Sequence, residues 1–222
     1  MNKNKNKNKN LIISLILILF AVTFVFLVKS VDVQAIGVND TYIGFAKLNQ
    51  FIFNAIGVNI LWYHITDWLG IIPIFMPFIY AIIGFIQLIK RKSLLKVDKE
   101  VLSLGVFYVV IIFVYIFFEK VIVNYRPILM NGFLEASFPS SHTLMAVCIC
   151  GSSIMVNKRL FINKISKFSN ILSLIIIIVT ILGRLISGVH WFTDILGGLI
   201  ISVALLMTFY SVLQLINKEK NK

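Results

Sequence analysis

The chain has 222 residues, of which 59% are hydrophobic, and it carries a formal net charge of +12 at neutral pH. Several uninterrupted apolar runs reach the roughly 18 residues that mark a membrane span, which excludes a soluble globular domain. Runs of that length predict an all-α polytopic membrane protein, because helices satisfy their own backbone hydrogen bonds in lipid. The positive charge lies mostly beside the apolar runs, so it predicts orientation in a membrane and not nucleic-acid binding.

The two ends of the chain are polar and cationic. Residues 1–10, MNKNKNKNKN, have nothing to bury and predict a disordered tail. A six-span domain is expected over residues 11–216, followed by a short cytoplasmic tail over residues 217–222. The first apolar run, residues 11–28, is longer than the roughly 7–15 residues of a signal-peptide core, so an uncleaved first span is expected.

The segment from residue 29 to about residue 68 alternates polar and apolar character and is rich in aromatic residues. Aromatic rings settle at the membrane interface, so this segment predicts short interfacial helices after the first span. His64 lies in it without a charged motif and is expected to be an ordinary interfacial residue.

The rest of the chain predicts five more spans. They are expected at about residues 69–88, 101–118, 143–156, 171–186 and 190–215. Pro73 and Pro77 are expected to kink the second span. Cys148 and Cys150 lie within an apolar run and are interpreted as packing residues, not as a disulfide.

The distribution of positive charge predicts the topology. Most of the 21 lysines and arginines fall in the two tails and in the segments 90–99 and 158–167, so these parts and both termini are expected in the cytoplasm. The exceptions are Lys29, Lys47, Lys120, Arg126 and Arg184. The last three belong to the candidate site, which is therefore expected to face the outside of the cell membrane.

The segment 183–194 places an arginine, a histidine and a carboxylate between two apolar runs. Such groups cost about 2.5–3.5 kcal/mol each at the centre of a membrane helix, which makes them functional candidates. His190 and Asp194 are four residues apart and are expected on one helical face, where the carboxylate orients the ring and leaves a nucleophilic nitrogen. A continuous helix would turn Arg184 away from His190, so the chain is expected to bend at Ser187-Gly188.

Two further polar segments are expected at the same membrane face. Lys120 and Arg126 follow the third predicted span, and with Arg184 they offer three cations to a phosphoryl group. Cations of this kind also serve as anchors for lipid headgroups, but their convergence with two histidines favours a phosphate site.

The sequence Pro139-Ser140-Ser141-His142 opens the fourth predicted span. Ser140 is a good helix cap, and the free backbone N–H groups of a helix start bind phosphate well. His142 then remains to protonate the leaving oxygen as a general acid.

Together these segments resemble the type 2 phosphatidic acid phosphatase superfamily, whose motifs are Lys…Arg-Pro, Pro-Ser-Gly-His and Ser-Arg-x5-His-x3-Asp. The resemblance covers the last four predicted spans. It implies a membrane lipid phosphatase that needs neither a metal nor another cofactor, in which His190 becomes phosphorylated, Asp194 orients it and His142 is the acid. It also implies a phosphate-binding set made of Lys120, Arg126, Arg184, Ser140 and Ser141.

The chain departs from the family pattern at three positions. Five residues separate Lys120 from Arg126 where the family has six, so Glu119 stands at the usual lysine position. Ser141 replaces a glycine, and Gly183 replaces a serine. None of these departures removes a catalytic group.

The family analogy points to hydrolysis of a lipid phosphate or diphosphate, with undecaprenyl diphosphate as the expected substrate and phosphatidylglycerophosphate or phosphatidate next. Two alternatives stay open: phosphotransfer to a hydroxyl acceptor, and a non-catalytic lipid-binding scaffold. A metal hydrolase built on His142, His190 and Asp194 is disfavoured, because the neighbouring cations would repel a divalent ion.

Overall fold

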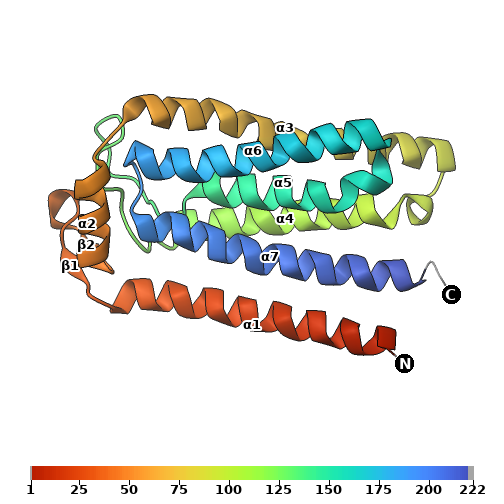
Figure 1. Ribbon diagram of the computed structural model, residues 1–222, viewed down its shortest axis with the longest axis horizontal. Coiled ribbons are helices and arrows are strands. Elements are labelled where there is room, and N and C mark those ends of the chain that lie inside the picture. Colours follow the sequence, from red (N-terminus) through yellow and green to blue (C-terminus); the bar gives the residue numbers. More distant parts are fainter. Residues whose placement is uncertain (1, 220–222) are drawn as a thin grey trace.

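The computed structural model describes the backbone of residues 2–219 and the side chains of residues 9–216. Within this part the chain forms seven α-helices. Figure 1 shows six of them side by side in an elongated bundle: α1 (Asn2–Ser30), α3 (Ile60–Arg91), α4 (Lys99–Lys120), α5 (Ser141–Leu160), α6 (Asn163–Ser187) and α7 (Phe192–Glu219). The helical membrane bundle predicted from the apolar runs is thereby confirmed.

The helices differ in how well they suit a lipid environment. Among residues 2–219, five helices are long and apolar enough to cross a membrane: α1, α3, α4, α6 and α7. The remaining long helix, α5, contacts α3, α4, α6 and α7, and buries polar side chains such as Ser152, Ser153 and Asn157. Since protein and not lipid surrounds α5, it needs no apolar surface, and the count of six spans stays a prediction.

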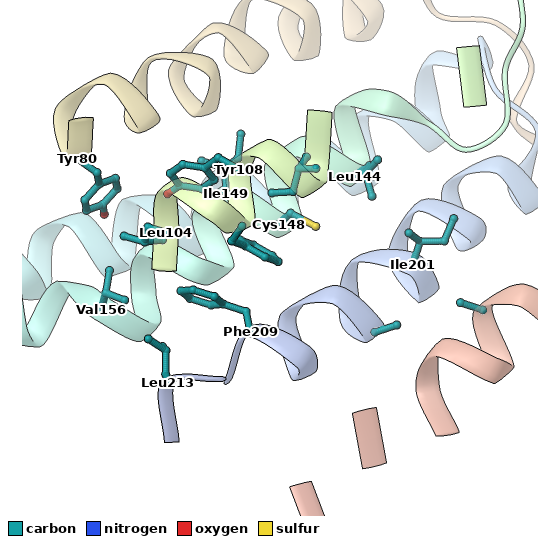
Figure 2. Packing of buried hydrophobic residues seen from close by; sticks show 14 of the residues in the cluster. Tyr80, Leu104, Tyr108, Leu144, Cys148, Ile149, Val156, Ile201, Phe209 and Leu213 are labelled. Carbon is teal, nitrogen blue, oxygen red and sulfur yellow. The ribbon is translucent and has the colours of Figure 1, made fainter. Parts of the chain in front are cut away.

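The core fills the space between α1, α3, α4, α5 and α7 (Figure 2). Phe107 of α4 stacks on Phe209 of α7 with ring centroids 4.7 Å apart. Tyr80 of α3 donates a buried hydrogen bond to Asn157 Oδ1 of α5 at 2.7 Å, which ties two helices together where water is absent. Cys148 and Cys150 are buried and free, as predicted.

One end of the bundle carries the polar connections, and we call it the site end. There α4 and α6 end and α5 and α7 begin, while both described chain ends lie at the opposite end (Figure 1). After α1 the chain forms a two-stranded antiparallel hairpin, β1 (Gln34–Ala35) and β2 (Tyr42–Ile43), around the 3-10 turn η1 (Val38–Asp40). The short helix α2 (Ala46–Ile56) follows at the same end, which confirms the predicted short helix after the first span.

Several boundaries differ from the sequence prediction. The second span begins at Ile60 instead of near residue 69, because Asn59 Oδ1 caps the helix by accepting from the Trp62 N–H at 3.2 Å. Pro73 and Pro77 both lie inside α3, which continues to Arg91 and is followed by the 3-10 turn η2 (Leu94–Lys96).

The predicted tails also differ from the structure. The helix α1 begins at Asn2, inside the segment 1–10 that was expected to be disordered, and α7 runs to Glu219, inside the predicted C-terminal tail. Extending a formed helix fixes one residue for each new hydrogen bond, so an apolar span can carry helical structure into a polar flank. Residues 1 and 220–222 of the predicted tails lie outside the described residues.

Candidate active site

Three chain segments meet at the site end of the bundle: the loop 121–140 between α4 and α5, the first turn of α5, and the connection from α6 to α7. The loop 121–140 folds back on itself through bridges between Tyr125 and Ala136 and between Met130 and Phe133. The Trp191 indole donates to the carbonyl of Tyr125 at 2.8 Å and so fastens this loop to the start of α7.

The connection from α6 to α7 is a sharp turn. The helix α6 ends at Ser187, and Gly188 follows in the left-handed conformation with φ of 65°. A Cβ at Gly188 would lie 2.1 Å from the carbonyl oxygen of Gly57, so the position accepts glycine alone. The bend predicted at Ser187-Gly188 is confirmed, and it brings His190 back towards the end of α6.

The prediction that His190 and Asp194 share one helical face is wrong. His190 precedes α7, which begins at Phe192. The Asp194 carboxylate accepts the Trp191 N–H at 2.9 Å, so it closes the first turn of the helix. His190 Nδ1 lies 3.8 Å from Asp194 Oδ2, which is longer than a hydrogen bond, so the two side chains are close but not hydrogen-bonded.

The Asp194 side chain is also held by the loop 121–140. Asn124 Nδ2 donates to Asp194 Oδ1 at 3.1 Å, and both side chains are buried. Asn124 comes from the loop 121–140, so this bond joins the loop after α4 to the start of α7. A buried carboxylate with hydrogen bonds to both oxygens has a fixed orientation.

His190 is buried and faces an arginine. Its Nε2 lies 3.4 Å from Arg126 Nη1, while Nδ1 has no hydrogen-bond partner among the described residues. Burial holds the pKa of His190 well below its ordinary value, and the charges of Arg126 and Arg184 lower it further. The imidazole is therefore neutral at neutral pH, which is the form that a nucleophilic histidine requires.

Arg126 and His190 line a small cavity at the site end, together with Ser141. Tyr115 and Phe118 of α4 also line it. The lining therefore includes cationic and polar groups as well as aromatic rings, which suits an amphiphilic ligand.

One glutamate pairs with Arg126, and another lines the cavity. Arg126 Nε forms an ion pair with Glu135 Oε2 at 3.0 Å, which holds the guanidinium in place. Glu119, which stands where the family has its lysine, lines the cavity together with Arg126.

Arg184 is fully buried at the end of α6, with 0% of its side chain exposed. Its guanidinium lies over the ring of Tyr63 at 5.1 Å from the centroid, and Nη2 lies 3.4 Å from Asp67 Oδ1. Nε and Nη1 have no partner among the described side chains. Buried guanidinium donors of this kind can bind the oxygens of an anion.

The first turn of α5 supplies His142 and backbone donors. His142 Nε2 lies 3.1 Å from Asp67 Oδ1. The Ser140 N–H donates to the Asp194 carbonyl at 3.0 Å, whereas the N–H groups of residues 141–143 have no acceptor within the helix. Ser141 is not among the described residues with positive φ, so serine fits where the family has glycine.

The structure does not bring Lys120 to the other predicted site residues. It is the exposed last residue of α4, and within the described part of the chain no hydrogen bond or ion pair joins it to His190, Arg126 or Arg184. The physical reason is the helix itself: Glu119 and Lys120 are adjacent and point to different sides, and Glu119 is the one at the cavity.

Sequence reasoning missed the contribution of α3. Tyr63 and Asp67 contact Arg184, and Asp67 also contacts His142. A signal existed, because Asp67 is a carboxylate at the edge of a lipid-length apolar run. Another α3 contact explains Gly183: a Cβ there would lie 2.3 Å from Thr66 Cγ2, so the family's serine would not fit.

The described residues contain no group of three His, Cys, Asp or Glu side chains placed to hold a metal ion. The site consists of imidazoles and guanidinium groups around the first turn of one helix. Guanidinium groups and free backbone N–H donors can bind an oxyanion, and a neutral imidazole can act as a nucleophile.

The chain is similar to proteins of one known family. The model of the PAP2 superfamily matches residues 103–218. Phosphatidylglycerophosphatase B of Bacillus subtilis (strain 168) is 31% identical over 93 residues, which cover 41% of this chain and 44% of that protein. The match thus spans less than half of the curated relative.

The fold has a counterpart among solved structures. The crystal structure of a transmembrane PAP2 type phosphatidylglycerolphosphate phosphatase from Bacillus subtilis aligns with a TM-score of 0.60 and 22% sequence identity. The alignment covers 94% of this chain and 97% of that one. At this identity the likeness concerns the fold, and it includes the part before residue 103 that the family model does not match.

Proposed function

This chain belongs to the PAP2 superfamily, and we propose that it is a membrane phosphatase that cleaves a lipid phosphate through a covalent phosphohistidine at His190. The observation that carries the proposal is the meeting of His190, Arg126 and Arg184 at one end of a lipid-embedded bundle. The two arginines bind the phosphoryl oxygens together with the free N–H groups at the start of α5.

The reaction proceeds in two steps. His190 Nε2 attacks phosphorus, so that a nitrogen–phosphorus bond forms while the bond from phosphorus to the lipid oxygen breaks. His142 gives its proton to that oxygen. His142 then takes a proton from a water molecule that attacks the phosphohistidine, which releases phosphate and restores His190.

Asp194 and the arginines stabilise the charges that develop during this reaction. Asp194 stabilises the positive charge that His190 acquires when it bonds to phosphorus. Arg126 and Arg184 stabilise the negative charge on the phosphoryl oxygens in the transition state. Arg126, Arg184 and His190 already surround the phosphate, which leaves no role for a divalent cation. We therefore propose that the reaction needs none.

The substrate is a lipid with a terminal phosphate. Tyr115 and Phe118 on the wall of the cavity support an amphiphilic substrate over a soluble phosphate ester. Phosphatidylglycerophosphate is the first candidate, because the curated relative and the solved neighbour are named for that phosphatase activity. Undecaprenyl diphosphate, expected from the sequence, is the second.

We place the site at the outer face of the cell membrane and both termini in the cytoplasm. The support is the charge distribution: the segments 90–99 and 158–167, which are rich in lysine and arginine, lie at the end of the bundle opposite to the site.

The test is phosphate release by the purified protein from phosphatidylglycerophosphate, undecaprenyl diphosphate and lysophosphatidate, beside the His190→Ala variant. We expect release from at least one lipid, unchanged by a chelator, and a fall of at least about 10³-fold in the variant. Wild type quenched in alkaline detergent should carry labelled phosphate that His190→Ala lacks, because the nitrogen–phosphorus bond of phosphohistidine survives alkali but not acid.

Each alternative predicts a different result. Phosphotransfer would give a phosphorylated hydroxyl acceptor with little free phosphate. A scaffold would release no phosphate from any of the lipids, and its cellular role would survive His190→Ala.

A further inference from the structure

One face of α3 covers two groups of the proposed reaction. Tyr63, Asp67 and Gly70 are spaced by four and three residues, so they lie on the same side of the helix. Tyr63 lies over the Arg184 guanidinium, and Asp67 and Gly70 lie against His142. This part of α3 precedes residue 103 and is outside the segment that the family model matches.

A single carboxylate oxygen of Asp67 joins the two groups. Oδ1 lies 3.1 Å from His142 Nε2 and 3.4 Å from Arg184 Nη2. The Asp67 side chain is 48% exposed and that of His142 is 26% exposed, whereas Arg184 is fully buried. Asp67 therefore lies on the open side of the His142 ring.

The His142 ring packs against Gly70. A Cβ at Gly70 would lie 2.8 Å from His142 Cδ2 and 3.3 Å from its Nε2. The ring thus packs directly on the α3 backbone, one turn beyond Asp67. With Asp67 at Nε2 and Gly70 against Cδ2, the ring plane is fixed from two directions.

The charges around His142 make Asp67 important for proton donation. Burial lowers the pKa of His142 below its ordinary value, and the charges of Arg184, His190 and Arg126 lower it further, so a protonated imidazole is disfavoured here. Asp67 is the carboxylate that faces the ring and favours the protonated form.

We propose that Asp67 is a positioning residue for proton transfer: it orients the His142 imidazole and stabilises the protonated ring that supplies the leaving lipid oxygen with a proton. The inference rests on the function proposed above. Asp67 forms no bond to the substrate. The proton moves from His142 to the oxygen as the oxygen–phosphorus bond breaks and the bond from phosphorus to His190 forms.

The test uses the Asp67→Asn variant and two substrates that differ in their leaving group. The single-turnover rate at which each substrate phosphorylates the protein is measured. An alkyl oxygen, as in phosphatidylglycerophosphate, needs a proton to leave, whereas p-nitrophenolate leaves without one. We expect the rate on the alkyl phosphate to fall by about 10²-fold or more and the rate on p-nitrophenyl phosphate by less than about fivefold. Asp67→Glu should retain more of the alkyl rate than Asp67→Asn.

Two controls separate this role from a structural one. Asp40→Asn removes an exposed carboxylate at the same end of the bundle and should change neither rate. Inorganic phosphate should bind Asp67→Asn at least as tightly as wild type, because a negative charge near the anion is lost.

The outcomes are distinguishable. Equal falls on both substrates, no fall on either, or phosphate binding weakened more than about tenfold would overturn the role of Asp67 and leave the phosphatase proposal intact. A wild-type protein that releases no phosphate from any substrate would overturn the proposed function, and this inference with it.

Discussion

Arg184 is the fully buried cation of the proposed phosphate site. Its contacts are the ring of Tyr63 and Asp67 Oδ1 at 3.4 Å. Burying a charge with so few partners is costly, so we interpret Arg184 as a residue whose charge is used. The planar fork of a guanidinium can contact two phosphate oxygens while it stacks on Tyr63, which an ammonium cannot do.

We therefore expect Arg184→Lys to lower kcat/KM by about 10²-fold although the charge is kept. Steady-state phosphate release by the purified variant checks this, with Lys120→Ala as the matched control. Lys120 is exposed at the end of α4, so its loss should change kcat/KM by less than about twofold. Near-normal turnover by Arg184→Lys would contradict the role of the guanidinium.

The burial of His190 predicts its behaviour with pH. Because the pKa of His190 is lowered well below its ordinary value, the ring should remain neutral and nucleophilic below pH 6.5. Ring NMR of the free protein, with the His190→Ala spectrum for assignment, measures this directly. A titration midpoint of His190 at or above 6.5 would show that the ring is not buried as described.

The same shift has a consequence for stability. The unfolded chain binds a proton at His190 near pH 6.5, whereas the folded state binds it only at lower pH. His190 therefore makes folding less favourable as the pH falls from 6.5 towards the lowered pKa, and has no such effect above that range.

At the scale of elements, α2 holds the start of α7. Asn49 Oδ1 accepts the Thr193 N–H at 3.1 Å, and Asn49 Nδ2 donates to Thr193 Oγ1 at 2.9 Å and to the Gly44 carbonyl at 2.8 Å. The Thr193 N–H is one of the first N–H groups of α7, which have no acceptor within the helix. Asn49 therefore caps α7 from outside, just beyond His190.

We expect Asn49→Ala to lower the free energy of unfolding by about 1–3 kcal/mol, because it leaves the buried Thr193 groups without partners. Phosphate release should fall as well, since the start of α7 carries Asp194. Thermal unfolding in detergent together with phosphate release checks both effects. Asn54→Ala, which changes an exposed asparagine of α2, should leave both unchanged.

Across the whole molecule, the helices differ in whether their surfaces contact lipid or protein. Large apolar side chains such as Phe20, Phe75 and Phe113 are exposed along α1, α3 and α4, as a surface in lipid requires. Polar side chains gather on α5 inside the bundle. The polar helix α5 thus lies inside the bundle, and its first turn lies near the end of α6.

The proposed orientation predicts which end reacts with a membrane-impermeant maleimide in intact cells. A cysteine introduced by the substitution Asp40→Cys, near α2, should be labelled without permeabilisation. A cysteine introduced by Leu95→Cys, at a residue that is 91% exposed in the turn η2 at the other end, should be labelled only after permeabilisation. Cys148 and Cys150 are buried and should give little background. The reverse pattern would place the site in the cytoplasm.

The sequence could predict the parts of this protein that depend on local pattern. The length of each apolar run predicts a helix, since lipid leaves the backbone few other choices. The short helix after α1 and the bend at Gly188 follow from local composition and spacing. The polar segments around Arg126, His142 and Arg184 were found because charge is rare beside such runs.

Other features depend on how the helices pack, which spacing along the chain does not encode. The turn before Phe192 left His190 outside α7, so its relation to Asp194 could not follow from helical spacing. Adjacent residues of α4 face different directions, and packing placed Glu119 at the cavity while Lys120 stayed exposed. The tertiary structure alone brought Asp67 to His142 and Arg184, because contacts between helices far apart in sequence arise when the bundle closes.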